Sequence, residues 1–323
     1  MLKFVAGIVG RLHHKLDDMV QHKVHTIAKL LGQPTDLSYV KYFLHYSQNM
    51  GYSYTIVHPF YPERIADTKG WIFFLIHGWT QNRTACPWFK PLTELLLKKF
   101  PESHVVQVDW GKLAAYRYTH AAFLTEAIGH RIAISIQILV NKNNFPLGNI
   151  VIIGHSLGGQ VAGWTGKWFY KHTKKKLSRI IALDPASPIF TVRPEAKRLN
   201  KNDADVVMVI HTDTINFGYP TNCGTIDFYP NGPNVQPGCR DVGKINVSAA
   251  TDSAWCSHRR AHDFFIEALK RPGGFIATKC DNFTNYKKQK CDRNTKVSMG
   301  DWLTKETGTF FLETAAEPPF IKR

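Results

Sequence analysis

A serine that follows a run of apolar residues is the feature of this sequence best suited to chemistry. Residues 150–154 read Ile-Val-Ile-Ile-Gly, and Ser156 stands at the centre of a Gly-x-Ser-x-Gly motif at 154–158, ahead of a stretch typical of a helix. A strand, a sharp glycine turn and a helix would raise the serine hydroxyl above a sheet as a nucleophile. The alternative is a glycine-rich helix start without chemistry, but the flanking elements favour the nucleophile.

A serine nucleophile needs a base, and the base needs a carboxylate that fixes its tautomer. In a strand–turn–helix site of this kind, the acid follows the serine along the chain and the histidine comes last. Asp184 directly follows the next apolar run, Arg179–Leu183. An Asp-Pro pair alone is more often a turn, but this position leads us to predict Asp184 as the orienting carboxylate.

Four histidines follow the serine and are candidates for the base. His172 lies among lysines and is set aside. His211 ends a predicted strand and would equally suit a core histidine bonded to backbone. We predict His258 as the base, because a loop ahead of a helix over Ala261–Lys270 would deliver it, and His262 is the weaker alternative.

An oxyanion hole requires two backbone N–H groups beside the nucleophile. The sequence predicts one from Leu157, which follows the serine directly. The second is predicted from Trp79, after an apolar run that ends at Ile76, where Gly78 permits a close approach of the backbone.

Apolar runs alternate with segments of helix length through the body of the chain. The runs are Trp71–Ile76, His104–Asp109, Asn149–Ile153, Arg179–Leu183 and Val206–Ile210. The helical segments are Pro87–Lys99, Thr119–Val140, Gly159–Lys171 and Pro194–Leu199. Continuously apolar strands alternating with helices predict a doubly wound α/β sheet, mostly parallel, with both faces covered.

The N-terminal part of the chain has a different pattern. Residues 2–31 carry apolar side chains at helical spacing with basic residues between them, which predicts a basic amphipathic helix. We therefore divide the chain into an N-terminal helix or targeting segment, 1–35, and a main domain, 36–323. The helix could pack on its own domain, dock on a membrane surface, or represent a poorly formed secretory signal. No apolar run approaches the roughly 18 residues of a membrane span.

The chain has 41 Lys and Arg against 25 Asp and Glu, a net charge of +16. This excess favours anionic partners such as lipid headgroups or sulfated glycans. The lysine-rich segments 171–176 and 287–290 are interpreted first as solvated faces. The sequence has no zinc knuckle and no aromatic RNA-binding motif, so a nucleic-acid partner is not expected.

Six cysteines, none in C-x-x-C spacing, argue against a zinc site. Glycosylation sequons occur at Asn82, Asn246 and Asn282. Together they favour an oxidising compartment and a secreted protein. The poor N-terminal signal leaves an intracellular membrane surface as the alternative.

Several motifs, in the same order along the chain, resemble the pancreatic lipase family of neutral lipases and phospholipases. They are Phe74–Trp79, Gly154–Gly159, Ala182–Pro188, Asp227–Gly232 and Cys256–His258. The resemblance runs from about Asp36 to Phe320 and implies an α/β-hydrolase fold, with 36–323 as the catalytic domain. It implies the same triad that the residues indicate, Ser156, Asp184 and His258.

The resemblance also implies a lid, closed by a disulfide between Cys239 and Cys256. The intervening segment, Arg240–Trp255, is shorter than in the triglyceride lipases of the family, and the stretch between 213 and 227 looks contracted. Family members with both loops shortened tend to accept phospholipids or galactolipids at the sn-1 ester. No colipase-type partner is expected.

Two further pairings follow from the resemblance. Cys280 should pair with Cys291, which leaves Cys86 and Cys223 as the remaining pair, with free thiols as the alternative.

The calcium loop of the family aligns with four residues of this chain, namely Glu195, Arg198, Asn200 and Asp203. Because Asn200 stands where the family has a carboxylate, calcium is expected to bind weakly, if it binds. The serine chemistry itself requires no cofactor.

The sequence thus predicts a serine hydrolase that cleaves lipid esters through an acyl-enzyme. Phospholipase A1-type activity is preferred over triacylglycerol lipase activity because the covering loops are short. The alternative from another class is a non-catalytic lipid-binding or carrier protein, suggested by yolk-protein relatives that have lost the nucleophile. A peptidase has only the shared triad chemistry in its favour.

Overall fold

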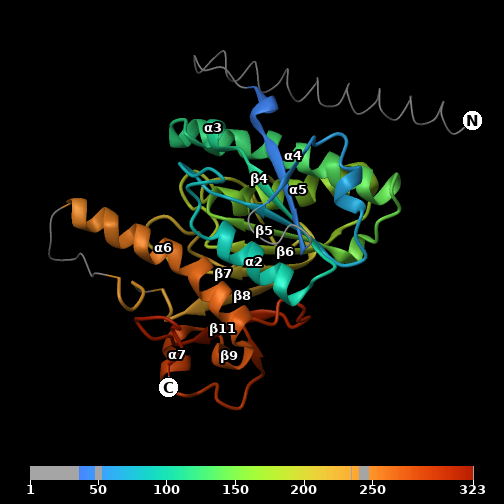
Figure 1. The fold of residues 1–323 in the computed structure, drawn as a ribbon. Helices are drawn as coiled ribbons and strands as arrows, with labels where there is room; N and C mark the ends of the chain where they lie inside the picture. The colour runs from blue at the N-terminus through green and yellow to red at the C-terminus, as the bar shows by residue number, and fades with distance from the viewer. Residues whose placement is uncertain (1–35, 48–52, 234, 240–246, 323) are drawn as a thin grey trace, which may run out of the picture.

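The computed structural model describes the chain except for residues 1–35, 48–52, 234, 240–246 and 323, and describes only the backbone of 247–254. The helix predicted over 2–31, and the segment 1–35 that contains it, therefore lie outside the described residues. From Asp36 onward the chain forms an eleven-stranded sheet with helices on both faces (Figure 1).

Seven neighbouring strands in the middle of the sheet run parallel. In sheet order they are β4 (His104–Asp109), β3 (Ile72–Ile76), β5 (Ile150–His155), β6 (Leu177–Leu183), β7 (Ala204–Ile210), β8 (Ile226–Pro230) and β11 (Gly308–Leu312). Antiparallel strands complete the edges: β1 (Lys41–Tyr46) and β2 (Thr55–Val57) beside β4, and β9 (Ile276–Lys279) and β10 (Lys296–Ser298) beside β11. Every residue of β3 and β5 is buried, as their continuously apolar sequences require.

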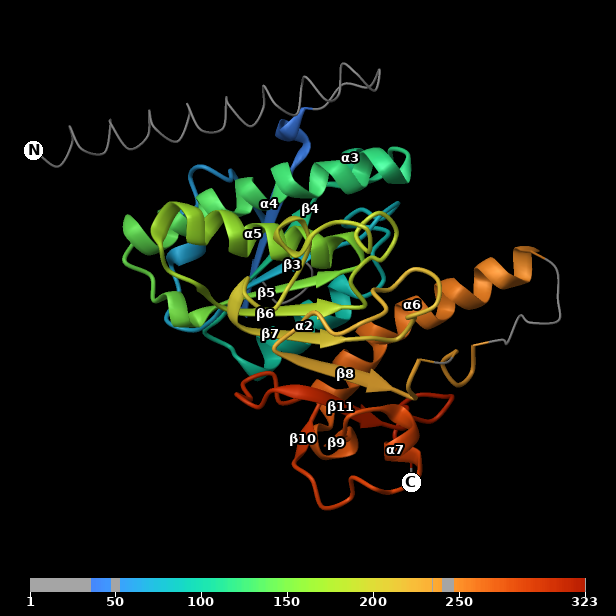
Figure 2. The same ribbon diagram turned by 180° about the vertical axis from the view of Figure 1, so that it is seen from behind.

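Two pairs of long helices cover the sheet, one pair on each face (Figure 2). α4 (Tyr118–Asn141) and α5 (Leu157–Thr173) bury their apolar faces in one core cluster, and α2 (Phe89–Lys99) and α6 (Val247–Lys270) in another. α4 is long and apolar enough to cross a membrane, but 78% of its most apolar window is buried in the protein. It is therefore a core helix.

Short elements connect these layers. They are α3 (Gly111–Ala114), α7 (Phe283–Lys287) and the 3₁₀ turns η1 (Leu37–Tyr39), η3 (Glu63–Ala66), η4 (Leu147–Asn149), η5 (Glu195–Lys197) and η6 (Pro272–Gly274).

The five predicted strands and three of the predicted helices are confirmed to within a few residues. The helix predicted over Pro194–Leu199 is wrong, because only the three residues of η5 are helical. The helix predicted over Ala261–Lys270 is real but begins at Val247. No proline or glycine occurs between 247 and 270, so nothing in the sequence breaks the helix there.

The cysteines form two disulfides and leave two thiols unpaired. The predicted pairs Cys239–Cys256 and Cys280–Cys291 are both present. The pairing of Cys86 with Cys223 is wrong, because both are free and buried. They belong to different core clusters, on opposite faces of the sheet. A disulfide joins Cα atoms at most about 7 Å apart and cannot reach through a sheet.

This arrangement predicts that unfolding without a reductant exposes two thiols per chain. Alkylation under denaturing conditions, followed by peptide mass spectrometry, should label Cys86 and Cys223 and leave the other four cysteines unlabelled. The folded protein should react far more slowly, since both thiols are buried and burial raises the pKa of each thiol. Recovery of a peptide in which Cys86 is linked to Cys223 would contradict the structure.

Candidate active site

Ser156 occupies a strained turn between β5 and α5. Its backbone dihedrals, φ 58° and ψ −123°, are ones that side-chain-bearing residues rarely adopt. The turn closes only because glycines flank it: a Cβ on Gly154 would lie 2.2 Å from the carbonyl oxygen of Gly158, and one on Gly158 would lie 2.1 Å from that of Ile76. The strand, turn and helix expected around the serine are therefore present.

Asp184 and His258 meet in a buried hydrogen bond. Asp184 follows β6, and its Oδ2 atom lies 2.6 Å from Nδ1 of His258. The other carboxylate oxygen accepts the N–H groups of Thr212 and Asp213, at 2.8 and 3.1 Å. Both side chains are almost completely buried. Because Nδ1–H donates to the carboxylate, Nε2 of His258 is left as an acceptor, which is the tautomer a general base requires.

His258 reaches this position from a helix. The predicted loop ahead of Ala261 is wrong, since His258 lies within α6. Its backbone carbonyl accepts a hydrogen bond of 3.1 Å from Nε2 of His155, the residue before the nucleophile. Burial, followed by the charges of His258 and His262, lowers the pKa of His155 well below its usual value. His155 therefore stays neutral and can donate this bond.

The ring of His258 packs against the residue that precedes the nucleophile. The rings of His155 and His258 are 4.6 Å apart between centroids, and Ser156 is buried next to His155. Nε2 of His258 is buried and has no hydrogen-bond partner among the described residues. No hydrogen bond therefore joins this atom to Ser156, but bonds between a serine and its base are often long in the absence of substrate, so the role of His258 as the base stays a prediction.

The other candidate histidines have different surroundings. His262 lies one turn beyond His258 on α6, stacks on Trp88 and places Nδ1 2.9 Å from Asp263. Within the described part of the chain, His258 alone of the predicted candidates contacts Asp184. The weaker alternative is therefore not placed for the role.

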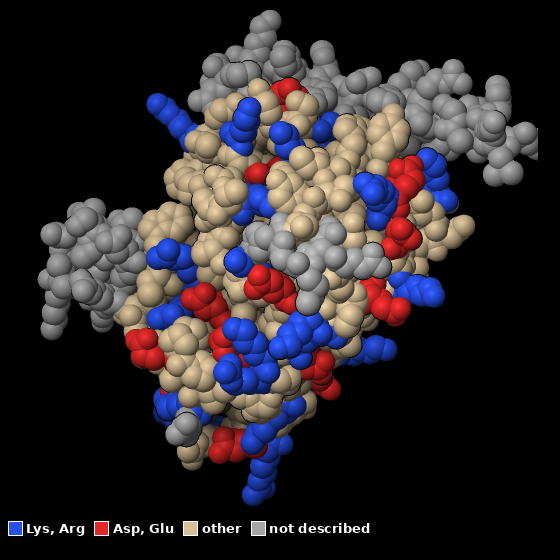
Figure 3. Space-filling view, in the orientation of Figure 1, with Lys and Arg blue, Asp and Glu red and all other residues tan. Residues whose placement is uncertain are grey.

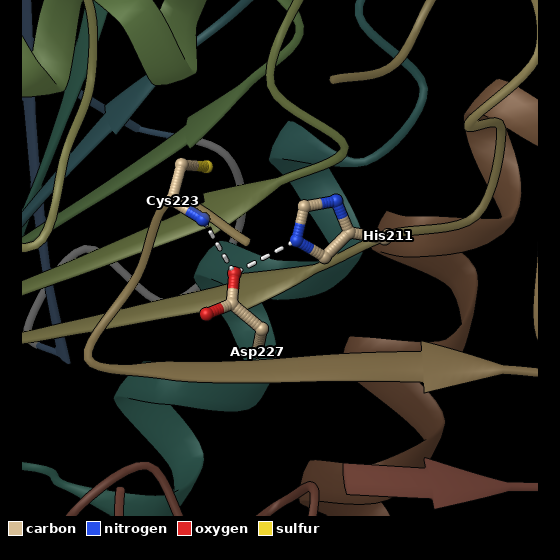
Figure 4. A group of neighbouring side chains, drawn as sticks. All are labelled: His211, Cys223 and Asp227. Carbon is tan, nitrogen blue, oxygen red and sulfur yellow. Dashed lines mark hydrogen bonds and ion pairs between the residues drawn. The ribbon is translucent and has the colours of Figure 1, made fainter. Parts of the chain in front are cut away.

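His211 is a buried structural histidine, as its alternative interpretation expected. Nδ1 lies 2.9 Å from the carbonyl oxygen of Tyr219, and Nε2 lies 2.9 Å from Asp227 (Figure 4). Cys223 donates its backbone N–H to the same carboxylate oxygen, at 3.0 Å. These bonds tie the end of β7 to β8. They also fix the following residue, Thr212, whose N–H is aimed at the predicted triad carboxylate.

The two predicted oxyanion donors lie beside the nucleophile. Gly78 packs so closely that a Cβ there would lie 2.8 Å from Cβ of Ser156. The backbone N–H groups of Trp79 and Leu157 have no hydrogen-bond partner in the described part of the chain. Trp79 is anchored instead through its indole N–H, which donates to the carbonyl of Tyr116 at 2.8 Å. Two backbone donors near Ser156 are therefore unused within the described part of the chain, and their role as an oxyanion hole stays a prediction.

A cavity of about 330 Å³ opens over the serine. Its lining is Gly78, Trp79, Thr80, Gln81, His155, Ser156, Trp255 and Arg259. This volume suits the reacting end of an ester, while the polar and charged lining residues would contact groups near the ester.

Two aromatic rings that cover the predicted base, and an arginine beside it, carry no motif that marks them in the sequence. Phe217 stacks on Trp255 at 4.6 Å, and both rings lie within about 6 Å of the ring of His258. Arg259 follows the histidine on α6 and lines the cavity. Trp255 and Arg259 are four residues apart, so a helix that includes both places them on the same face. That spacing is the sequence signal that could have found them.

Comparison with known proteins places this arrangement in a family. The family model of lipases matches residues 8–320. The chain belongs to the lipase family. It is 34% identical over 269 residues to a lipoprotein lipase of Gallus gallus, covering 77% of this chain and 54% of the relative. A lipoprotein lipase of Homo sapiens is 32% identical over 267 residues, covering 77% of this chain and 55% of the relative.

The aligned region spans about half the length of these relatives. The family that the motifs resemble is thereby confirmed, and so is the α/β-hydrolase fold, whose parallel sheet and elbow this chain has.

The lid predicted for this lipase-family protein is described only in part. The disulfide Cys239–Cys256 is present, and residues 247–255 form the first turns of α6. Residues 240–246 lie outside the described part of the chain. The covering function of this segment stays a prediction.

The four residues expected at a calcium loop lie together after β6, but their polar atoms do not fit a calcium ion. Asp203 directs Oδ1 to the ammonium group of Lys167 on α5, and its Oδ2 accepts the N–H of Asn200 at 2.9 Å. Asn200 turns its NH₂ group to the carbonyl of Glu195, at 2.8 Å. Arg198 adds a positive charge, with Nη2 3.6 Å from Glu195 Oε1. Calcium needs converging oxygen acceptors, and here those acceptors already have donors.

One glycine in the site lends itself to a direct stability test. Gly218 lies against Asp184, so a Cβ there would come within 2.4 Å of both carboxylate oxygens. Gly218→Ala should lower the melting temperature by about 3–9 °C, corresponding to overpacking of about 1–3 kcal/mol. Gly148→Ala is the matched control, since a Cβ there meets nothing within 4 Å. Equal melting temperatures for the two variants, measured by circular dichroism, would contradict this packing.

Proposed function

We propose that this protein hydrolyses carboxylic esters of lipids through an acyl-enzyme. The observation that carries the proposal is the buried 2.6 Å bond between His258 and Asp184. This bond leaves Nε2 of His258 as an acceptor, and the strained serine elbow with two unpartnered backbone N–H groups supports the rest of the proposal. Membership of the lipase family supports lipids as the substrate class.

In the proposed first step, Oγ of Ser156 attacks the ester carbonyl while Nε2 of His258 takes the serine proton. The carbonyl oxygen becomes an oxyanion, which accepts hydrogen bonds from the N–H groups of Trp79 and Leu157. His258 then gives the proton to the departing alcohol, leaving the acyl group on the serine. Asp184 stabilises the imidazolium that forms in between. Water repeats the sequence and releases the fatty acid.

Replacement of the nucleophile tests this mechanism. Ser156→Ala should reduce kcat on emulsified phosphatidylcholine and on tributyrin by about 10⁴- to 10⁶-fold, because no acyl-enzyme can form. The melting temperature should remain close to that of the wild type, and Ser178→Ala on β6 is a matched control that should keep full activity. Full activity in Ser156→Ala would refute the mechanism. A wild-type protein without activity on either ester would favour a non-catalytic lipid carrier.

We further propose phospholipase A1-type selectivity, for the sn-1 ester of a phospholipid or galactolipid, over triacylglycerol lipase activity. The 212–219 loop folds down onto the triad: Gly218 donates to the carbonyl of Asp213 at 2.8 Å, and Tyr219 to that of Pro185 at 2.7 Å. A loop that packs this closely against the triad residues leaves space above the site for a polar headgroup. Arg259, at the cavity, could pair with a phosphate through charge-assisted hydrogen bonds.

The arginine gives this selectivity a test. Arg259→Gln should lower kcat/KM on phosphatidylcholine by about tenfold or more, in line with the loss of a charge-assisted bond of about 1.5–3 kcal/mol. The value on tributyrin, which has no phosphate, should change by no more than about threefold. The exposed Arg64, on η3 and outside the cavity lining, provides the control Arg64→Gln. An equal loss on both substrates would contradict a headgroup role.

We also propose that the protein is secreted and acts at a membrane or lipid-particle surface. Two disulfides support an oxidising compartment. The sequon residues Asn82 and Asn282 are exposed, whereas Asn246 lies outside the described residues. Figure 3 shows basic side chains interspersed with acidic ones on one face, which suits a solvated surface there. An anionic lipid or a sulfated glycan remains the proposed partner for the excess positive charge.

A further inference from the structure

The loop between β6 and β7 packs against α5 without intervening side chains. A Cβ on Gly163 would lie 2.8 Å from Cα of Leu199, and one on Gly166 would lie 2.0 Å from the carbonyl oxygen of Asp203. Two glycines one turn apart thus let the backbone of the 195–203 loop approach the helix closely. This contact brings the Asp203 carboxylate down beside the next residue of α5, Lys167.

Lys167 and Asp203 form an ion pair that is largely shielded from water. The lysine side chain is 15% exposed and the aspartate side chain 3%. A carboxylate buried to this degree requires a compensating cation or strong hydrogen bonds. The lysine ammonium supplies that cation from within the chain.

The side-chain acceptors of Asn200 and Glu195 also have partners within the loop. Asn202 donates its N–H to Oδ1 of Asn200 at 2.8 Å, so that the one side-chain acceptor of Asn200 is already used. Glu195, the second carboxylate, faces Arg198. Each acidic side chain of the loop therefore has its own basic partner. Among these residues, no two oxygen acceptors without donors point toward a common position where a calcium ion could bind.

We propose that the ammonium group of Lys167 holds the 195–203 loop against α5 in the place of a calcium ion, so that the loop is ordered without calcium. The residues that the family resemblance assigns to calcium remain, except for the carboxylate replaced by Asn200. Their electrostatic role has passed to a lysine 36 residues earlier in the chain. This inference does not depend on whether the protein hydrolyses esters.

The loop matters because hydrogen bonds connect it to the serine elbow. Leu199 donates its N–H to Oε1 of Gln160 at 2.9 Å, and the Nε2 group of Gln160 donates to the carbonyl of Ala186 at 2.8 Å. Ala186 in turn donates its N–H to the carbonyl of Ser156 at 3.1 Å. An ion pair that orders the loop therefore also supports the backbone of the nucleophile.

The first test uses the wild-type protein. Its melting temperature should be the same, within about 1 °C, in EDTA and in millimolar calcium, because a site without free acceptors gives no binding energy to the folded state. Isothermal titration with calcium chloride should give no binding heat. A melting temperature that rises with calcium, or falls in EDTA, would overturn the proposal.

The second test removes the internal cation. Lys167→Met keeps the length of the side chain but leaves Asp203 buried without a partner, so the melting temperature should fall by about 5–10 °C. Lys171→Met removes the same charge one turn later on α5, from an exposed side chain that packs over Trp168, and should have little effect. Equal melting temperatures for the two variants would overturn the assignment.

If Lys167→Met does not fold, the double variant Lys167→Met with Asp203→Asn decides the matter, because it removes both charges together. The double variant should fold, since no buried carboxylate is then left without a partner. Its melting temperature should not respond to calcium. A double variant as unstable as the single one would mean that the ion pair is not what holds the loop, and would overturn the proposal.

Discussion

The hydrogen bond between Asp184 and His258 links three parts of the chain that are far apart in sequence. Asp184 follows β6, the two N–H groups that hold its other oxygen follow β7, and His258 lies on α6. The pairing of Leu183 with Ile210 sets the register that puts the ends of β6 and β7 side by side. α6 must then pass close to the ends of β6 and β7. The hydrogen bond between Asp184 and His258 therefore depends on the sheet register and on the position of α6. The bond between His211 and Asp227 holds the neighbouring strand ends in place.

Close backbone contacts give the same region its rigidity. Gly158 allows α5 to begin directly above the carbonyl of Ile76, and Gly78 allows the oxyanion loop to touch Ser156. A residue held at φ 58° costs about 1–3 kcal/mol, so the surrounding packing must impose it. The 195–203 loop adds to that packing through Gln160. Order in a loop remote from the reacting atoms thereby contributes to the position of the nucleophile.

Much of the fold could be predicted from local sequence, because apolar runs of strand length and helical periodicity are local signals. The elbow and Asp184 could be placed because strand order fixes where they emerge. The start of α6 is harder to predict, because the signal that the helix begins well before His258 is only the absence of proline and glycine from 247 onward. An even number of cysteines suggests a pair between Cys86 and Cys223, but only the fold shows that they belong to core clusters on opposite faces of the sheet. Lys167 was missed because its partner is distant in the chain, and only packing brings them together.

The central claim is that Asp184 and His258 make the hydroxyl of Ser156 a nucleophile. The most direct measurement is the rate at which a fluorophosphonate phosphonylates the wild-type protein and Asp184→Asn, with the modified peptide identified by mass spectrometry. The account predicts a single adduct on Ser156 in the wild type and a rate lower by about three to four orders of magnitude in Asp184→Asn, whose base would have the wrong tautomer. Labelling of another residue, or equal rates for the two proteins, would contradict it.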